Sequence, residues 1–211
     1  MTIEKFTFNE FQENTYVIYD QTKECIIIDP GCNNKKEEEK LLNFIKNKKL
    51  KPKKLINTHC HIDHVFGNNF INKIFELELH IHEKEKENLD LAKKYSEIYG
   101  IKYQPYTEKL NFIKENEKIY FGKNVLEIIF TPGHSPGHLS FVSNKKKIII
   151  SGDVLFKESI GRTDLPGGNY ATLIQSIKTK ILNYPEEYTI FPGHGPETQI
   201  SYEKKYNPFL N

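Results

Sequence analysis

Short hydrophobic stretches alternate with polar ones along most of the chain, a pattern that predicts many short strands separated by helices. Runs of roughly four to eight apolar or alternating residues, bounded by Gly, Pro, Asn or Asp, are typical of strands. They place strands near residues 3–8, 15–20, 24–29, 53–58, 77–82, 117–121, 124–131, 139–143, 147–152 and 187–191. Longer segments with helical spacing place helices near 35–47, 65–75, 83–99, 168–182 and 199–206. Periodicity alone therefore predicts an α/β protein and no particular architecture.

Four side chains able to bind a metal ion lie between His59 and His64, in the sequence His-Cys-His-Ile-Asp-His. On an extended segment, residues two apart project to the same side, so His59 and His61 can bind one ion together. Asp63 and His64 are adjacent and should point apart from each other, where they can serve a second ion. Imidazole and carboxylate groups suit zinc and chemically similar ions. The segment therefore predicts a metal site, with a histidine-rich surface turn as the alternative.

Three more candidate ligands follow, each where a predicted strand meets a loop rich in Gly and Pro, a usual place for active-site residues. They are His134, Asp153 and His194. Two ions that share a carboxylate would need three histidines on one side and a carboxylate with two histidines on the other. The chain supplies that set: His59, His61 and His134 for one ion, Asp63, His64 and His194 for the other, and Asp153 between them.

Aspartate and arginine are scarce in this chain, which makes the positions that keep them informative. Six aspartates stand against 22 glutamates, and Asp29, Asp63, Asp153 and Asp164 all fall in motifs with Gly, Pro or His. The shorter carboxylate is therefore expected to be needed at those positions. Arg162 is the single arginine among 30 basic residues, and lysine cannot replace its planar fork of donors. We expect Arg162 either to bind an anionic part of the substrate or to belong to a structural ion pair.

The other candidate side chains are expected to support the site rather than to bind metal. His138 should be buried and hydrogen-bonded, while His80 and His82 should be structural or solvated. Asp29 ends a strongly apolar strand before Pro-Gly, so it should cap that turn or hydrogen-bond a ligand. Cys60 lies between two ligands, but the pleat should point it away from them, so a packed thiol is expected.

Length and composition favour one domain spanning residues 1–211. The mean hydropathy is −0.59, which indicates a soluble protein, and no apolar run approaches the ~20 residues that cross a bilayer. The N-terminus shows no charged-then-apolar leader and the three cysteines indicate no disulfide framework, so we expect a cytoplasmic protein. A net charge of +2, with Lys and Glu interspersed, gives no support for nucleic-acid binding. The expected partner is a small-molecule substrate, with no membrane partner, and the oligomeric state is left open.

With these motifs the chain resembles the metallo-β-lactamase superfamily of binuclear metallohydrolases, whose signature is H-x-H-x-D-H. The resemblance extends from Ile-Asp-Pro-Gly at 28–31, through Gly-Arg-Thr-Asp at 161–164 and Phe-Pro-Gly-His-Gly-Pro-Glu-Thr at 191–198, to Asn-Pro-Phe at 207–209. Within the superfamily the chain is most similar to the short, single-domain glyoxalase II (hydroxyacylglutathione hydrolase-like) type. The resemblance implies a four-layer αββα sandwich of two mixed β-sheets. It also implies two divalent metal ions, zinc in the first place with iron or manganese as alternatives, and a glutathione contact at Arg162.

The implied reaction is hydrolysis of a 2-hydroxyacyl thioester such as S-lactoylglutathione. Two ions lower the pKa of a shared water toward ~7, and the bridging hydroxide attacks the carbonyl carbon. Asp63 and Asp153 are the candidate proton acceptors. No Ser/His/Asp set argues for a separate nucleophile.

Two departures from full-length glyoxalase II leave the thiol carrier open. Those enzymes add a C-terminal helical domain, whereas this sequence continues for 17 residues after His194, and Pro196 stands where they place a tyrosine. The alternative is a mononuclear iron persulfide (sulfur) dioxygenase of the same fold, because such iron needs only two histidines and one carboxylate. A nuclease, a secreted β-lactamase and a non-catalytic binding module are all disfavoured. A nuclease would need an inserted domain and a basic patch, and a secreted β-lactamase would need a leader. A binding module would have no use for the complete set of metal ligands.

Overall fold

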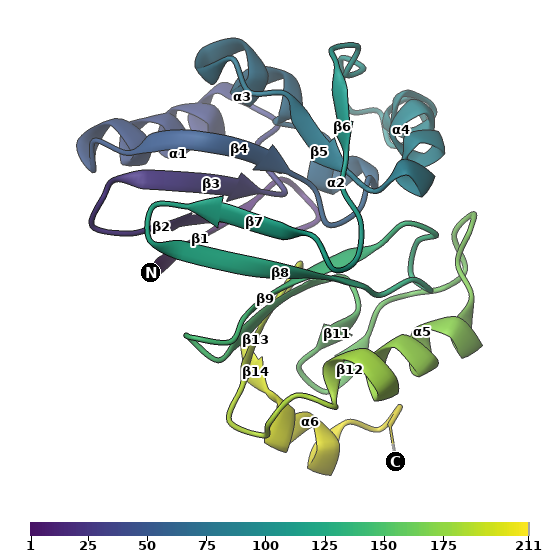
Figure 1. Ribbon diagram of the computed structural model, residues 1–211. Coiled ribbons are helices and arrows are strands. Elements are labelled where there is room, and N and C mark those ends of the chain that lie inside the picture. Colours follow the sequence, from purple (N-terminus) through teal and green to yellow (C-terminus); the bar gives the residue numbers. More distant parts are fainter. Residues whose placement is uncertain (211) are drawn as a thin grey trace. The chain divides into compact units, whose positions relative to one another are not determined.

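The computed structural model describes residues 1–210, which fold as two compact units. The first unit comprises Met1–Ile113 with Tyr120–Asn124, and the second comprises Lys114–Ile119 with the residues from Val125 onward. Each unit contains one six-stranded sheet, and helices flank both sheets (Figure 1).

The first unit carries a mixed sheet whose strands lie in sequence order. The strands are β1 (Thr2–Phe8), β2 (Glu13–Tyr19), β3 (Glu24–Ile28), β4 (Lys51–Ile56), β5 (Leu79–Ile81) and β6 (Leu110–Phe112). The helices are α1 (Lys35–Asn47), α2 (Ile62–Val65), α3 (Asn68–Phe75), η1 (Glu83–Glu85) and α4 (Lys86–Ile98). Pairing is antiparallel from β1 to β3 and parallel from β3 to β6. Each parallel step needs a crossover, and the helices of this unit supply it.

Helix α1 shows how the sequence places a helix on this sheet. The side chain of Asn34 caps its N-terminus by accepting the Glu37 N–H at 3.1 Å. Leu41 and Ile45, one turn apart, are buried in a core that they share with side chains of β3 and β4. Burial of these apolar faces fixes the sheet, and with it the loops that leave its edge.

The parallel strands β3 and β4 end together, which brings two functional loops to one edge of the first sheet. Ile28 pairs with Ile56, and the next residue, Asp29, donates its N–H to the Ile56 carbonyl at 2.9 Å. Asp29 therefore lies beside the loop that runs from Asn57 to His61.

The second unit carries the other mixed sheet, in the order β14-β13-β10-β9-β8-β7. Its strands are β7 (Lys118–Phe121), β8 (Asn124–Phe130), β9 (Leu139–Ser143), β10 (Ile148–Gly152), β13 (Thr189–Pro192) and β14 (Thr198–Gln199), with the separate hairpin β11 (Leu155–Phe156) and β12 (Ser159–Ile160). The helices are α5 (Tyr170–Ser176), its continuation η2 (Ile177–Ile181), and α6 (Ile200–Tyr206). The end of β7, the turn after it and the first residue of β8 (Tyr120–Asn124) belong to the first unit, where Asp20 accepts the Lys123 N–H at 2.8 Å and the Asn124 amide at 2.7 Å.

The elements predicted from the sequence are confirmed with small shifts. Helix α1 has the predicted bounds, whereas the helix predicted at 65–75 is divided into α2 and α3. Four strands were not predicted: β6, β11, β12 and β14. Each has only two or three residues, too few to show a period, and exists because a neighbouring strand offers hydrogen bonds. A single domain over residues 1–211 stays a prediction.

Among residues 1–210, no helix combines the length and the apolar character that crossing a membrane requires. The three cysteines are buried free thiols. Burial raises the pKa of the Cys60 thiol well above its usual range, so the expectation of a packed thiol at this position is confirmed.

Candidate metal centre

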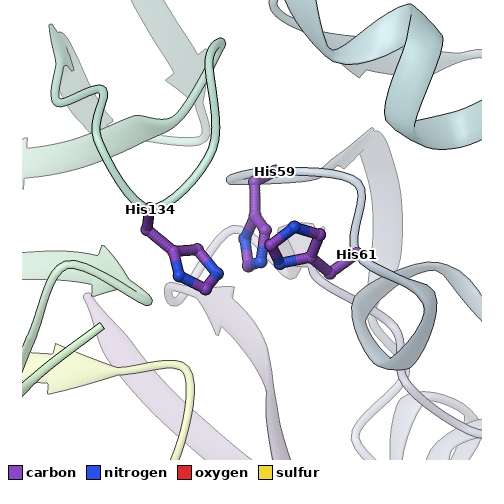
Figure 2. A group of neighbouring side chains, drawn as sticks. All are labelled: His59, His61 and His134. Carbon is purple, nitrogen blue, oxygen red and sulfur yellow. The ribbon is translucent and has the colours of Figure 1, made fainter. Parts of the chain in front are cut away.

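The loop that follows β4 brings its histidine rings together in the first unit. The rings of His59 and His61 lie 4.7 Å apart, nearly perpendicular, and those of His59 and His64 lie 4.2 Å apart. His59 and His64 are fully buried, and Asp63 is 9% exposed. Figure 2 shows His59 and His61 leaving the same loop of the first unit.

One prediction about this loop is wrong. Asp63 and His64 do not point apart, because His64 Nε2 lies 3.6 Å from an Asp63 carboxylate oxygen. The alternation of an extended segment ends at His61, which precedes the first residue of α2. The backbone over Ile62–Val65 is helical, and this brings the side chains of Asp63 and His64 toward each other.

Asp29 contacts His64 directly and His59 through Thr58. Its Oδ2 lies 3.1 Å from His64 Nδ1 and accepts the Thr58 hydroxyl at 2.6 Å. That hydroxyl lies 3.0 Å from His59 Nδ1, and since its proton goes to Asp29, it must accept a proton from His59. The tautomer of His59 therefore carries hydrogen on Nδ1 and leaves Nε2 for a metal ion. Asp29 therefore reaches His59 through the Thr58 hydroxyl, and the role of His59 as a metal ligand stays a prediction.

Three further side chains hold the backbone of the loop, and no motif in the sequence pointed to them. Asn9 donates its amide to the Asp63 carbonyl at 3.0 Å, and Asn57 donates to the His64 carbonyl at 2.7 Å. The buried carboxylate of Glu85 accepts the Cys60 N–H at 2.8 Å. Asn9 and Glu85 lie 54 and 25 residues from their partners, so no local pattern could have identified them.

Glu13 is a second carboxylate near His64 that sequence reasoning missed. Glu13, Asp29 and His64 are all buried and present ligand atoms within 4.8 Å of one another. Burial raises the pKa of the Glu13 carboxyl well above its usual range, and the nearby His64 partly counteracts this shift. The surroundings of His64 Nδ1 are therefore rich in carboxylate.

In the second unit, Asp153 lies between two histidines. Its Oδ2 is 3.5 Å from His134 Nε2 and 3.4 Å from His194 Nε2. His134 donates from Nδ1 to the Arg162 carbonyl at 2.7 Å, because a carbonyl oxygen can only accept. His134 Nε2 is therefore the atom with a lone pair, and it faces the carboxylate.

Glycines allow the close packing around this carboxylate. A side chain at Gly161 would collide with the Asp153 carbonyl, and one at Gly133 would collide with the backbone of Leu173. Gly133 also has a φ of 132°, which side chains rarely adopt. Gly161 lets the loop that carries Arg162 pass next to Asp153, and Gly133 lets the loop that carries His134 pass next to α5.

His138 supports the same site, as predicted. It is fully buried, and its Nε2 accepts the Asp153 N–H at 3.1 Å. Its Nδ1 therefore carries the proton and lies 3.0 Å from the Thr131 hydroxyl. The other two histidines also have structural roles, since His80 Nδ1 contacts the carbonyl of Leu55 and His82 caps η1.

The distances between the candidate donor atoms match those between ligands of one metal ion better than those of direct hydrogen bonds. Nitrogen and oxygen ligands at about 2.0–2.2 Å from a tetrahedral ion lie roughly 3.3–3.6 Å apart. Among the candidate ligands, the imidazole–carboxylate distances are 3.6 Å for His64 with Asp63, 3.5 Å for His134 with Asp153 and 3.4 Å for His194 with Asp153, all too long for strong hydrogen bonds. Imidazole with carboxylate is also the donor chemistry of zinc, iron and manganese sites. Each unit therefore carries a histidine-rich group of candidate ligands for divalent metal.

Arg162 belongs to an exposed ion pair. Its Nε and Nη2 donate to the two carboxylate oxygens of Asp164 at 2.7 and 2.8 Å. These hydrogen bonds lower the pKa of the Asp164 carboxyl to about 2. The ion pair expected as one alternative for Arg162 is present, and substrate binding stays a prediction.

Comparisons with known proteins agree with this geometry. Residues 8–194 match the model of the metallo-beta-lactamase superfamily. A hydroxyacylglutathione hydrolase named GloC from Haemophilus influenzae is 38% identical over 100% of this chain and 99% of its own. The crystal structure of the BLEG-1 B3 metallo-beta-lactamase matches with a TM-score of 0.91 and 35% identity, covering 100% of both chains. That of TTHA1623 in a di-iron-bound form matches with a TM-score of 0.88 and 31% identity, covering 98% of this chain and all of the other.

These matches cover both compact units and confirm the predicted fold class, an α/β fold with two mixed β-sheets. With the candidate metal centre, they identify the chain as a metallo-hydrolase that belongs to the metallo-β-lactamase superfamily.

Proposed function

We propose that this protein is a binuclear metal-dependent hydrolase that cleaves a 2-hydroxyacyl thioester such as S-lactoylglutathione. In this proposal His59, His61 and His134 bind one ion, Asp63, His64 and His194 bind the other, and Asp153 is shared. The observation that carries it is the position of Asp153 Oδ2, which faces both His134 and His194 at 3.5 and 3.4 Å. A carboxylate oxygen between histidines assigned to different ions is what a bridging ligand requires.

The residues of the chain prepare this site for hydrolysis. When bound, the ions supply hydroxide at neutral pH and polarise the substrate carbonyl. Asp29 and Thr58 hold His59 with Nε2 available, and His138 holds the backbone of Asp153. Asp63, which is slightly exposed, and Asp153 are the groups able to accept a proton during the reaction.

The substrate class rests on the relative and on the loop that contains Arg162. The hydroxyacylglutathione hydrolase from Haemophilus influenzae shares 38% of its residues with this chain over nearly its whole length. We propose that Arg162 binds an anionic part of the thiol carrier, because a guanidinium fork matches a carboxylate. We assign the protein to a reducing cytoplasm, which its three free thiols support.

Iron chemistry is the second candidate, and one neighbour favours iron as the metal, although it holds two iron ions. TTHA1623 is 31% identical to this chain and has been crystallised in a di-iron-bound form. A mononuclear iron persulfide dioxygenase would need only two histidines and one carboxylate, so Asp63, His64 and His194 would be dispensable.

Substitution of the proposed ligands tests the binuclear arrangement. We expect Asp153→Asn to keep the fold but to lower kcat/KM by at least ~10²-fold and to weaken metal occupancy. His194→Ala should also lower both, while His80→Gln, a histidine outside the set, should leave both near the wild-type level. Metal analysis gives the occupancy of each purified variant. One tightly bound ion at saturation, together with a harmless His194→Ala, would contradict the binuclear site.

The reaction type is tested by two assays on the same preparation. Thiol release from S-lactoylglutathione reports hydrolysis, and oxygen consumption with glutathione persulfide reports dioxygenase activity. We expect thiol release that depends on His64 and His194. Oxygen uptake that follows iron content and survives loss of these two histidines, without thioester cleavage, would assign the protein to the dioxygenases.

A further inference from the structure

The guanidinium group of Arg162 is engaged by a carboxylate of its own loop. Asp164 accepts from Nε and Nη2 at 2.7 and 2.8 Å, which is the two-pronged geometry that a ligand carboxylate would adopt. Both side chains are largely exposed, at 58% and 68%. Asp164 can therefore turn into solvent without disturbing any packed side chain.

The loop that carries this pair is attached at one end to His134, a proposed metal ligand, and at the other end to Gly133, the residue before it. The Arg162 carbonyl accepts from His134 Nδ1 at 2.7 Å. At the far end, Asn169 donates its N–H to the Gly133 carbonyl, also at 2.7 Å. The ion pair thus lies beside the site and not at an unrelated surface position.

We propose that Asp164 is a built-in competitor for anionic substrates at Arg162, and so a specificity-determining residue. This inference rests on the proposed function. The ligand class is a thioester whose thiol carrier bears a carboxylate. Binding exchanges one carboxylate for another on the same fork, and Asp164 moves into water. When the thiol product leaves, Asp164 returns to Arg162 and opposes rebinding.

The competition lowers the affinity for anionic substrates and leaves the affinity for neutral substrates unchanged. Exposed ion pairs are weak, so the competition should reduce affinity by about 1.5- to 5-fold. A thioester without a carboxylate has nothing to exchange and gains nothing when Asp164 is removed. Asp164 therefore affects anionic and neutral thioesters differently, although both have the same reacting bond.

The test is Asp164→Asn in the metal-loaded enzyme, with S-lactoylglutathione and an S-lactoyl thioester of the uncharged thiol N-acetylcysteamine. We expect a KM for S-lactoylglutathione that is about 1.5- to 5-fold lower, and an unchanged KM for the neutral thioester.

Loss of one negative charge from the surface would also favour the binding of any anionic substrate, whether or not Asp164 competes for Arg162. Two controls separate this effect from competition. Asp164→Asn should have no effect in an Arg162→Gln background. Glu187→Gln removes the same charge from the exposed Lys147 pair, at the opposite end of β13 from His194, and should not change KM.

Binding without turnover separates this inference from the proposed reaction. S-methylglutathione has the carboxylates of the substrate but no thioester, and its affinity can be measured by titration calorimetry. Tighter binding to Asp164→Asn that requires Arg162 supports the competition even if no thioester is cleaved, in which case the proposed hydrolysis is wrong. Unchanged affinity, or an equal gain in the Arg162→Gln background, overturns the role of Asp164. A lower melting temperature with unchanged affinity would show that the ion pair is only structural.

Discussion

At the scale of single residues, the direction of each hydrogen bond around Asp153 is fixed by chemistry. The Asp153 N–H can only donate, so His138 Nε2 accepts and His138 Nδ1 carries the proton. The Ser140 hydroxyl donates to the Ser151 carbonyl at 3.3 Å, so the Thr131 hydroxyl donates to Ser140. Thr131 is then left to accept from His138. The whole chain of bonds thus selects one tautomer of His138.

His138 should therefore affect metal binding without being a ligand. We expect His138→Ala to weaken metal affinity by roughly 10- to 100-fold, because the backbone that presents Asp153 loses an acceptor. His138→Gln can place a carbonyl oxygen near the same N–H and should recover part of that loss. Competition with a chromophoric chelator measures the affinity. His80→Gln is the matched control in the other unit. Wild-type affinity in His138→Ala would show that Asp153 is held by other contacts.

At the scale of elements, a buried carboxylate joins the segments on either side of His194. Glu203 of α6 accepts the Thr198 hydroxyl at 2.5 Å on one oxygen. Its other oxygen accepts the Glu158 N–H at 3.0 Å, in the turn between β11 and β12. The same hairpin carries Phe156, whose ring lies 6.1 Å from that of His194 and nearly perpendicular to it. Helix α6 therefore helps to place a proposed ligand that it does not contain.

Replacing Glu203 should destabilise this arrangement. Glu203→Gln is isosteric but puts an amide N–H against donors, so we expect the free energy of unfolding to fall by about 2–4 kcal/mol. Glu186→Gln, at an exposed carboxylate near Lys204, should change it by less than about 0.5 kcal/mol. Urea denaturation measures both variants. Equal effects of the two substitutions would refute the role assigned to Glu203.

At the scale of the molecule, the proposed ligands are divided between the two compact units. The first unit supplies His59, His61, Asp63 and His64, and the second supplies His134, Asp153 and His194. A metal ion that binds the folded form and not the unfolded form raises the free energy of unfolding by about 2.7 kcal/mol when its free concentration is a hundred times its Kd.

Removal of metal with a chelator should therefore lower the melting temperature by roughly 5–10 °C, given about 2–4 °C per kcal/mol for a chain of this size. The difference between metal-loaded and metal-free protein should shrink in Asp153→Asn and in His64→Ala, one variant from each unit. Differential scanning calorimetry provides the measurement. A melting temperature that does not respond to chelation would argue against metal binding by the folded chain.

The sequence by itself determined features that depend on neighbours along the chain. The bounds of α1 follow from its Asn34 cap and the spacing of Leu41 and Ile45, and the candidate ligands follow from residue type and spacing. Burial of His138 was also predicted from its position, because Gly-His at the start of a strand is a local pattern.

The tertiary structure decided what depends on residues far apart in the sequence. Asp29 meets Thr58 and His64 only because β3 and β4 pair in parallel and end at the same edge of the sheet. Asp63 and His64 converge because one helical turn replaces the extended backbone that their spacing suggested. Side-chain periodicity describes local backbone, whereas hydrogen bonds across 15 to 54 residues depend on which strands and loops pack together. That packing is set by burial of the whole core and not by any one segment.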